Sequence, residues 1–189
     1  MNESVLNENT ALAGTPTDGL QEGRQSTSDE ISGAAPSLRF PKRDKLRHRS
    51  LVEGLFAGGK SLFEYPLRAQ WRYLTADRLQ ENFKHGLPRD IAPLQMMVTV
   101  PKKKRRRAVD RVLMRRRIRE AFRLNRSELR QFASSLPEGG SVQVAFIYLH
   151  DKNADYKDVE KAMIKLLDLL RKKLQKQINN PQTPPDGQS

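Results

Sequence analysis

The chain has 189 residues, enough for one domain of ordinary size with tails. It contains 35 lysine and arginine residues against 22 aspartate and glutamate residues, a formal net charge of +13, and no cysteine. The lack of cysteine excludes disulfides, cysteine–zinc sites and thiol nucleophiles. No apolar run approaches the roughly 20 residues needed to cross a bilayer, and the acidic, polar N-terminus does not resemble a signal peptide. We therefore expect a soluble, basic, cytoplasmic protein that contacts no membrane.

The two ends of the chain differ in composition from the middle. Residues 1–35 are rich in Asn, Thr, Ser and Gly, and they contain six acidic residues and one basic residue, a net charge of −5. We predict that residues 1–37 form a disordered acidic arm, because they show no apolar periodicity. Residues 179–189 contain three prolines and are predicted to be a flexible tail. The folded domain is therefore expected over residues 38–178.

The first two predicted elements are a helix and a strand. Over residues 47–57 apolar side chains recur at helical spacing, and Gly58 and Gly59 are expected to end this helix in the left-handed conformation. Residues 67–73 alternate between apolar and polar side chains, which is typical of a half-buried strand. Its polar outer face carries Arg68, Gln70 and Arg72.

The rest of the chain predicts two more strands and a long helix, separated by a basic segment. Residues 75–93 are polar and are expected to be an irregular, exposed insertion, whereas 94–100 and 142–149 are apolar runs suited to strands. An amphipathic helix follows from Tyr156 to Leu174. With the helices packed on one sheet, this order predicts a small two-layer α/β or α+β domain.

Nearly the whole net charge lies in residues 101–126, where thirteen basic residues face two acidic ones. One apolar stripe with helical spacing, suited to docking on a core, runs through this segment at Met114, Ile118, Ala121 and Phe122. Beside it lies a stripe of arginines, with Arg116 adjacent, at Arg111, Arg115, Arg119 and Arg123. A solvated basic run such as a localisation signal is the plain alternative, but a docked helix lined with arginines favours a nucleic-acid partner.

No enzyme active site is evident from the residues themselves. The three histidines have no metal-ligand spacing, and the sequence from Asp151 to Asp155 departs from a calcium loop at its glycine and glutamate positions. Nor does any glycine cluster complete a phosphate-binding loop. We therefore predict no catalytic residue, leave metal sites unassigned, and expect a binding protein.

Three segments together resemble the protein subunit of bacterial ribonuclease P. They are Val98-Thr99-Val100-Pro101-Lys102-Lys103, Arg107-Ala108-Val109-Asp110-Arg111, and Arg115-Arg116-Arg117-Ile118-Arg119-Glu120-Ala121-Phe122-Arg123. Upstream, Lys45-Leu46-Arg47, Leu55-Phe56, Gly59-Lys60 and Tyr65-Pro66-Leu67-Arg68 are similar to that family's first helix and strand. The resemblance covers residues 40–175.

The resemblance implies a fold and a set of partners. The fold is an α/β sandwich like domain 2 of ribosomal protein S5, with a small mixed sheet and a left-handed β-α-β crossover around the basic helix. Its partners are the catalytic RNA, which cuts with Mg²⁺, and the 5′ leader of precursor tRNA; no DNA partner is expected. The residues expected to contact the catalytic RNA are Lys102, Lys103, Arg105, Arg106, Arg107, Arg111, Arg115, Arg116, Arg119 and Arg123. By position, the leader-binding cleft would be lined by Val52, Phe56, Arg68 and Gln70.

The sequence departs from the family at one point of this signature. Where the family has Arg-Asn-Arg, this chain has Arg111-Val112-Leu113. We hypothesise that Arg105 to Arg107 contact the RNA phosphates that the missing arginine would have contacted. Neutralising them should then weaken RNA binding more than neutralising as many charges in the last helix. Two alternatives stay open: a non-catalytic RNA-binding protein of the ribosomal type, and a DNA-binding protein. The second is disfavoured because the helix lacks Asn or Gln at base-reading positions.

Overall fold

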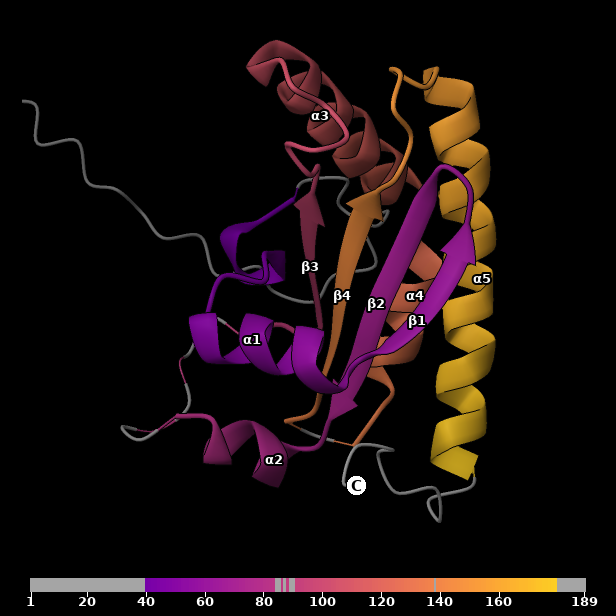
Figure 1. The fold of residues 1–189 in the computed structure, drawn as a ribbon. Coiled ribbons are helices and arrows are strands. Elements are labelled where there is room, and N and C mark those ends of the chain that lie inside the picture. Colours follow the sequence, from indigo (N-terminus) through magenta and orange to yellow (C-terminus); the bar gives the residue numbers. More distant parts are fainter. Residues whose placement is uncertain (1–39, 84–85, 87, 89–90, 138, 180–189) are drawn as a thin grey trace, which may run out of the picture. The chain divides into compact units, whose positions relative to one another are not determined.

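The computed structural model describes residues 40–83, 86, 88, 91–137 and 139–179. The predicted acidic arm and residues 180–189 of the predicted tail lie outside these residues. A mixed four-stranded sheet forms the centre of the fold, in the strand order β1-β2-β4-β3 (Figure 1). The strands are β1 (Lys60–Glu64), β2 (Leu67–Leu74), β3 (Leu94–Thr99) and β4 (Ser141–Tyr148). Pairing is antiparallel between β1 and β2 and between β2 and β4, and parallel between β3 and β4.

Helices lie on both faces of this sheet (Figure 1). The parallel strands β3 and β4 are connected through α3 (Ala108–Asn125) and α4 (Ser127–Ser134), and α5 (Tyr156–Asn179) follows β4. These three helices cover one face, where alternate residues of β4, from Val142 to Tyr148, belong to the main apolar core. On the other face α1 (Arg49–Gly58) and α2 (Ala76–Glu81) pack in a smaller cluster around Leu51, Leu55 and Ala145. A short 3-10 helix, η1 (Lys42–Asp44), precedes α1.

The elements with strong periodicity are confirmed. The predicted helix before Gly58, the strands at 67–73, 94–100 and 142–149, the basic helix and the long last helix are all present. Every residue of β4 is buried, as expected for an inner strand. The sheet with helices gives the mixed α+β class that was predicted.

Besides η1, three short elements were not predicted. The strand β1 is an edge strand in which Leu62 is the apolar side chain packed against the main core, so its sequence shows little alternation. The expectation of an irregular insertion over 75–93 is wrong at its start, where α2 buries Leu79 completely. The eight-residue helix α4 follows α3 directly after Arg126. Each of these segments is too short to show a clear apolar period.

The end of α1 also differs from the prediction. Gly59 follows the helix with φ −79° and ψ 147°, which is extended backbone rather than the left-handed conformation. The chain enters β1 at the next residue, so an extended backbone is required there. Glycine is needed for space instead: a Cβ on Gly59 would lie 2.3 Å from the Leu55 carbonyl oxygen and 3.0 Å from Gln70 Cγ.

Candidate nucleic-acid interface

The basic helix α3 is anchored by its apolar stripe. Met114, Ile118, Ala121 and Phe122 are all buried in the main core, as their spacing predicts. Phe122 contacts the ring of Phe146 from β4 at a centroid distance of 5.6 Å. Fixing one side of a helix in this way leaves its other sides, including the arginine rows, on the surface.

Seven basic side chains of this region are at least partly exposed and form no side-chain hydrogen bond or ion pair with the described residues. Arg116 and Arg119 are exposed and Arg115 is partly exposed, and none of the three forms an ion pair within the described residues. The loop before the helix adds four exposed cations. We call this set the α3 basic surface: Lys102, Lys103, Arg106, Arg107, Arg115, Arg116 and Arg119.

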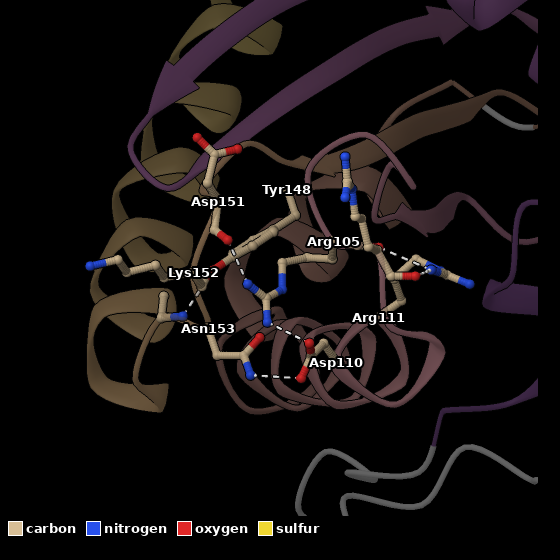
Figure 2. Close-up of polar contacts among 9 residues, drawn as sticks. Arg105, Asp110, Arg111, Tyr148, Asp151, Lys152 and Asn153 are labelled. Atoms are coloured by element: carbon tan, nitrogen blue, oxygen red, sulfur yellow. Dashed lines mark hydrogen bonds and ion pairs between the residues drawn. The ribbon is translucent and has the colours of Figure 1, made fainter.

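Arg105 belongs to the same basic run but is used internally (Figure 2). Its guanidinium donates to the backbone carbonyl of Asp151 and pairs with the Asp110 carboxylate at 2.6 Å, and only 14% of the side chain is exposed. Asn153 donates to the other Asp110 oxygen at 3.0 Å. This hydrogen bond, and then the charge of Arg105, lower the pKa of Asp110. Arg105 therefore fixes the basic loop to the β4–α5 connection, and little of it is available to a ligand.

Three further arginines of α3 make internal contacts. Arg111 donates to the backbone carbonyls of Arg105, at 2.9 Å, and of Arg106 (Figure 2). The Arg117 guanidinium donates to the Ala154 carbonyl, which ties α3 to the segment before α5. Arg123 pairs with Glu120 one turn earlier at 2.6 Å. Of the predicted RNA contacts, Arg111 and Arg123 thus have protein partners as well.

The last basic residue of the run, Arg126, is buried. It forms an ion pair with Asp44 of η1, and each side chain is 4% exposed. Its guanidinium also lies over the rings of Phe40 and Phe122, at 5.3 Å and 6.0 Å from the ring centroids. This cluster joins the start of the described chain to the end of α3, so Arg126 is a structural residue.

The sequence is similar to known proteins of one family. Residues 40–171 match the family model named Ribonuclease P. A curated ribonuclease P protein component from Porphyromonas gingivalis is 32% identical over 132 residues, covering 70% of this chain and 86% of that protein. The same component from a second strain is 32% identical over 126 residues, covering 67% and 82%. The chain belongs to the ribonuclease P protein family. Membership implies an RNA partner in the complex.

A solved structure of the ribonuclease P protein of Staphylococcus aureus is also similar. The two chains are 14% identical, with a TM-score of 0.47, and the match covers 67% of this chain and 94% of that one.

The departure from the ribonuclease P signature lies on the surface of α3. Val112 and Leu113, which stand where the family has Asn-Arg, are 43% and 36% exposed, and Val109 one turn earlier is 78% exposed. These side chains therefore change the character of the exposed helix face and not the packing of the core. We hypothesised that Arg105 to Arg107 contact the RNA phosphates in place of the missing arginine. Because Arg105 binds Asp110 and the Asp151 carbonyl, only Arg106 and Arg107 remain for this role.

The residues predicted to line a leader-binding cleft differ in accessibility. Phe56 is 41% exposed and Arg68 is exposed, whereas Val52 is partly buried against the smaller core. Gln70 is 9% exposed and donates to the carbonyls of Leu55, Phe56 and Gly59, so it fixes the end of α1 to the sheet. The expectation that Gln70 lies on an open polar face is wrong, because α1 covers that part of β2.

Two features of this face were not anticipated from the sequence. Arg72 donates to Gln143 at 2.7 Å and to the Leu51 carbonyl at 2.8 Å, and its partial burial lowers its pKa. Phe63 is 61% exposed and is the cross-strand partner of Arg68, so the ring and the guanidinium leave the same side of the sheet. The only feature of the sequence that could have predicted an exposed ring at Phe63 is an apolar residue at an outward position of the edge strand.

Proposed function

We propose that this chain is the RNA-binding protein subunit of a ribonuclease P holoenzyme that removes the 5′ leader from precursor tRNA in the cytoplasm. The observation that supports it most is the α3 basic surface on a chain of this family: seven cations on one docked helix and its preceding loop. Arginine is suited to this work because its planar fork binds phosphate oxygens in two places and stays charged at all relevant pH values.

The proposed contact to the catalytic RNA is mainly with its phosphates. The side chains of the α3 basic surface end in donors only; four lie in the loop before α3 and three in the middle of the helix. Binding of this kind releases counterions and weakens steeply with salt. It positions the protein on a folded RNA without reading bases, and specificity then comes from the shape of the RNA.

The proposed contact to the leader uses the α1 face of the sheet. Phe56 and Phe63 offer exposed rings for stacking on unpaired bases of the leader. Arg68 supplies a cation for the leader's phosphate backbone. Val52 and Gln70 contribute by positioning: the first packs α1 on the sheet and the second binds the carbonyls at its end.

The proposal assigns bond cleavage and its Mg²⁺ ions to the RNA. Among the described residues no group of three or more His, Asp or Glu side chains is arranged to hold a metal ion. Nor does any helix of the described part of the chain have the length and apolar character needed to span a membrane.

The test is cleavage of precursor tRNA by the catalytic RNA at low magnesium, with and without the protein. The proposal predicts that the protein restores cleavage and that the product begins at the mature 5′ end. The alternative is a basic RNA-binding protein of the ribosomal type, which would bind the RNA and leave both the rate and the magnesium requirement unchanged. Competition with duplex DNA at about 0.2 M salt distinguishes these two RNA-binding functions from generic polyanion binding. A generic polyanion binder loses its preference for the RNA over the DNA as the salt concentration rises.

A further inference from the structure

A cationic cavity lies apart from the α3 basic surface, between β1 and the C-terminal half of α5. It has a volume of about 910 Å³, and its charged lining consists of lysines. We call it the lysine groove and define it by Lys60, Lys172, Lys173, Lys176, Leu169 and Trp71. All four lysines are exposed, and no acidic residue lines the groove within the described part of the chain.

The two elements of the groove bring their cations together from distant parts of the sequence. Lys60 is the cross-strand partner of Trp71, so both side chains leave the face of the sheet that α5 covers. Lys172 forms an ion pair with Asp168 at 3.2 Å, whereas Lys60, Lys173 and Lys176 form none with the described residues. Lysines near a helix C-terminus interact favourably with the helix dipole, which can explain the lysines of α5. This interaction does not explain the presence of Lys60, which lies on a strand.

Polar atoms without partners lie at the same place. Trp71 is 2% exposed, and its indole N–H has no hydrogen-bond partner among the described residues. A neighbouring cavity of about 390 Å³ shares Lys60 and Gln177 with the groove and adds Arg72 and Arg78. Tyr73 lines this cavity, and its hydroxyl and Gln177 Oε1 are likewise buried without a hydrogen-bond partner in the described part of the chain. Buried polar groups normally find a partner, so these three groups need one from the adjoining cavities, either an ordered water or a ligand.

Figure 1 shows α3 beside the N-terminal end of α5, whereas three lysines of the groove, Lys172, Lys173 and Lys176, belong to the C-terminal end of α5. Arg117 binds the Ala154 carbonyl just before α5 begins, whereas Lys176 lies 20 residues after Tyr156. At 1.5 Å per residue this is about 30 Å along the helix. A ligand in the groove therefore occupies a different place from a phosphate bound by Arg115 or Arg116.

We propose that the lysine groove binds the phosphate backbone of a second RNA segment, separate from the one bound by the α3 basic surface. The proposal rests on the proposed function for its RNA, and it gives the protein two RNA contacts, one near each end of α5. Clustered, flexible ammonium groups with no acidic neighbour in the lining suit a polyphosphate backbone better than a single defined anion.

Trp71 provides a direct probe, because it is the only tryptophan in the chain. The full-length protein is titrated with a single-stranded oligouridylate of about twelve nucleotides while the tryptophan emission is followed. We expect a saturable change in emission. The variant Lys173→Gln/Lys176→Gln should shift its midpoint to about tenfold higher RNA concentration, since removing a cation that binds a phosphate lowers both the affinity and its salt dependence.

The matched control is Lys157→Gln/Lys161→Gln, which removes the same charge from exposed positions of the same helix, beside Asp158 and Glu160. It should leave the midpoint within about twofold of the wild type. Equal midpoint shifts in the two double variants would contradict RNA binding in the groove. So would unchanged tryptophan emission under conditions where fluorescence anisotropy shows that labelled oligouridylate saturates the protein. Absence of any RNA binding by anisotropy would instead count against the proposed function.

Discussion

Two sets of arginines on and beside α3 carry the same charge and do different work. Arg105, Arg111, Arg117 and Arg126 donate to carbonyls or carboxylates of the protein, and these contacts attach the helix and its loop to η1 and the β4–α5 connection. Arg115, Arg116 and Arg119 form no ion pair with described residues and lie at the surface. A dense basic run therefore divides into an inner set that binds the protein itself and an outer set that is available to a ligand.

The largest expected effect comes from the inner set. Arg126→Met leaves the buried Asp44 carboxylate with only the partly exposed Arg130, 4.0 Å away, as an ion-pair partner. Breaking a buried pair typically costs about 3–5 kcal/mol of folding free energy. Urea denaturation measures the loss. The double variant Asp44→Leu/Arg126→Met should recover much of it, because no uncompensated charge remains. If the single variant unfolded at the same urea concentration as the wild type, Arg126 would not be structural.

The outer cations of the loop should act on RNA and not on folding. Arg106→Gln/Arg107→Gln is expected to weaken binding to the catalytic RNA about tenfold, with the urea midpoint unchanged, since both side chains are exposed. The comparison is Lys157→Gln/Lys161→Gln in α5, measured by filter binding at one fixed salt concentration. Equal losses in the two variants would remove the special role given to the loop.

Restoring the family pattern sharpens the same contrast. Val112→Asn/Leu113→Arg replaces two exposed apolar side chains, so stability should stay within about 0.5 kcal/mol. RNA affinity should rise about three- to tenfold through one added cation and one added amide donor. Val112→Asn/Leu113→Gln adds polarity without charge and should produce the smaller part of this gain. An unchanged affinity in both variants would show that this part of α3 does not contact the RNA.

The smallest effect concerns the carboxylate that orients Arg105. The pKa of Asp110 lies below its ordinary value of 3.8, so Asp110 stabilises the folded state fully above about pH 5 and loses this contribution as the pH falls below 3.8. The stability difference between the wild type and Asp110→Asn should therefore shrink on acidification. Urea denaturation at several pH values between 3 and 7, with Glu160→Gln as control, measures it. A difference that grew toward low pH would mean that the carboxylate is not stabilised by Asn153 and Arg105.

The sequence predicted the long elements of the fold well and the short ones poorly. The basic helix and the last helix repeat apolar residues over several turns, and β4 is a continuous apolar run, so their patterns are unambiguous. In contrast, α2 has one buried apolar residue, Leu79, and β1 one inward apolar residue, Leu62. A single residue defines no period.

The division of the arginines could not be predicted, because their partners are distant in sequence. Arg105 meets Asp151 46 residues later, Arg117 meets Ala154 37 residues later, and Arg126 meets Asp44 82 residues earlier. The sequence pattern places Arg117 on α3 and Arg105 and Arg126 just outside its two ends, but it does not reveal which residues lie opposite them. Gln70 was misplaced for the same reason, since only the packed position of α1 covers it.

The most direct measurement is the salt dependence of affinity for the catalytic RNA in two triple variants, Arg115→Gln/Arg116→Gln/Arg119→Gln and Arg105→Gln/Arg111→Gln/Arg117→Gln. Each variant is first checked for native circular dichroism. The division of arginines predicts that the outer triple lowers the slope of log affinity against log salt by about 2 to 3, because it removes up to three cations that bind phosphates. The inner triple should lower stability and change the slope by less than about 1. A folded inner triple with the larger decrease in slope would contradict the division.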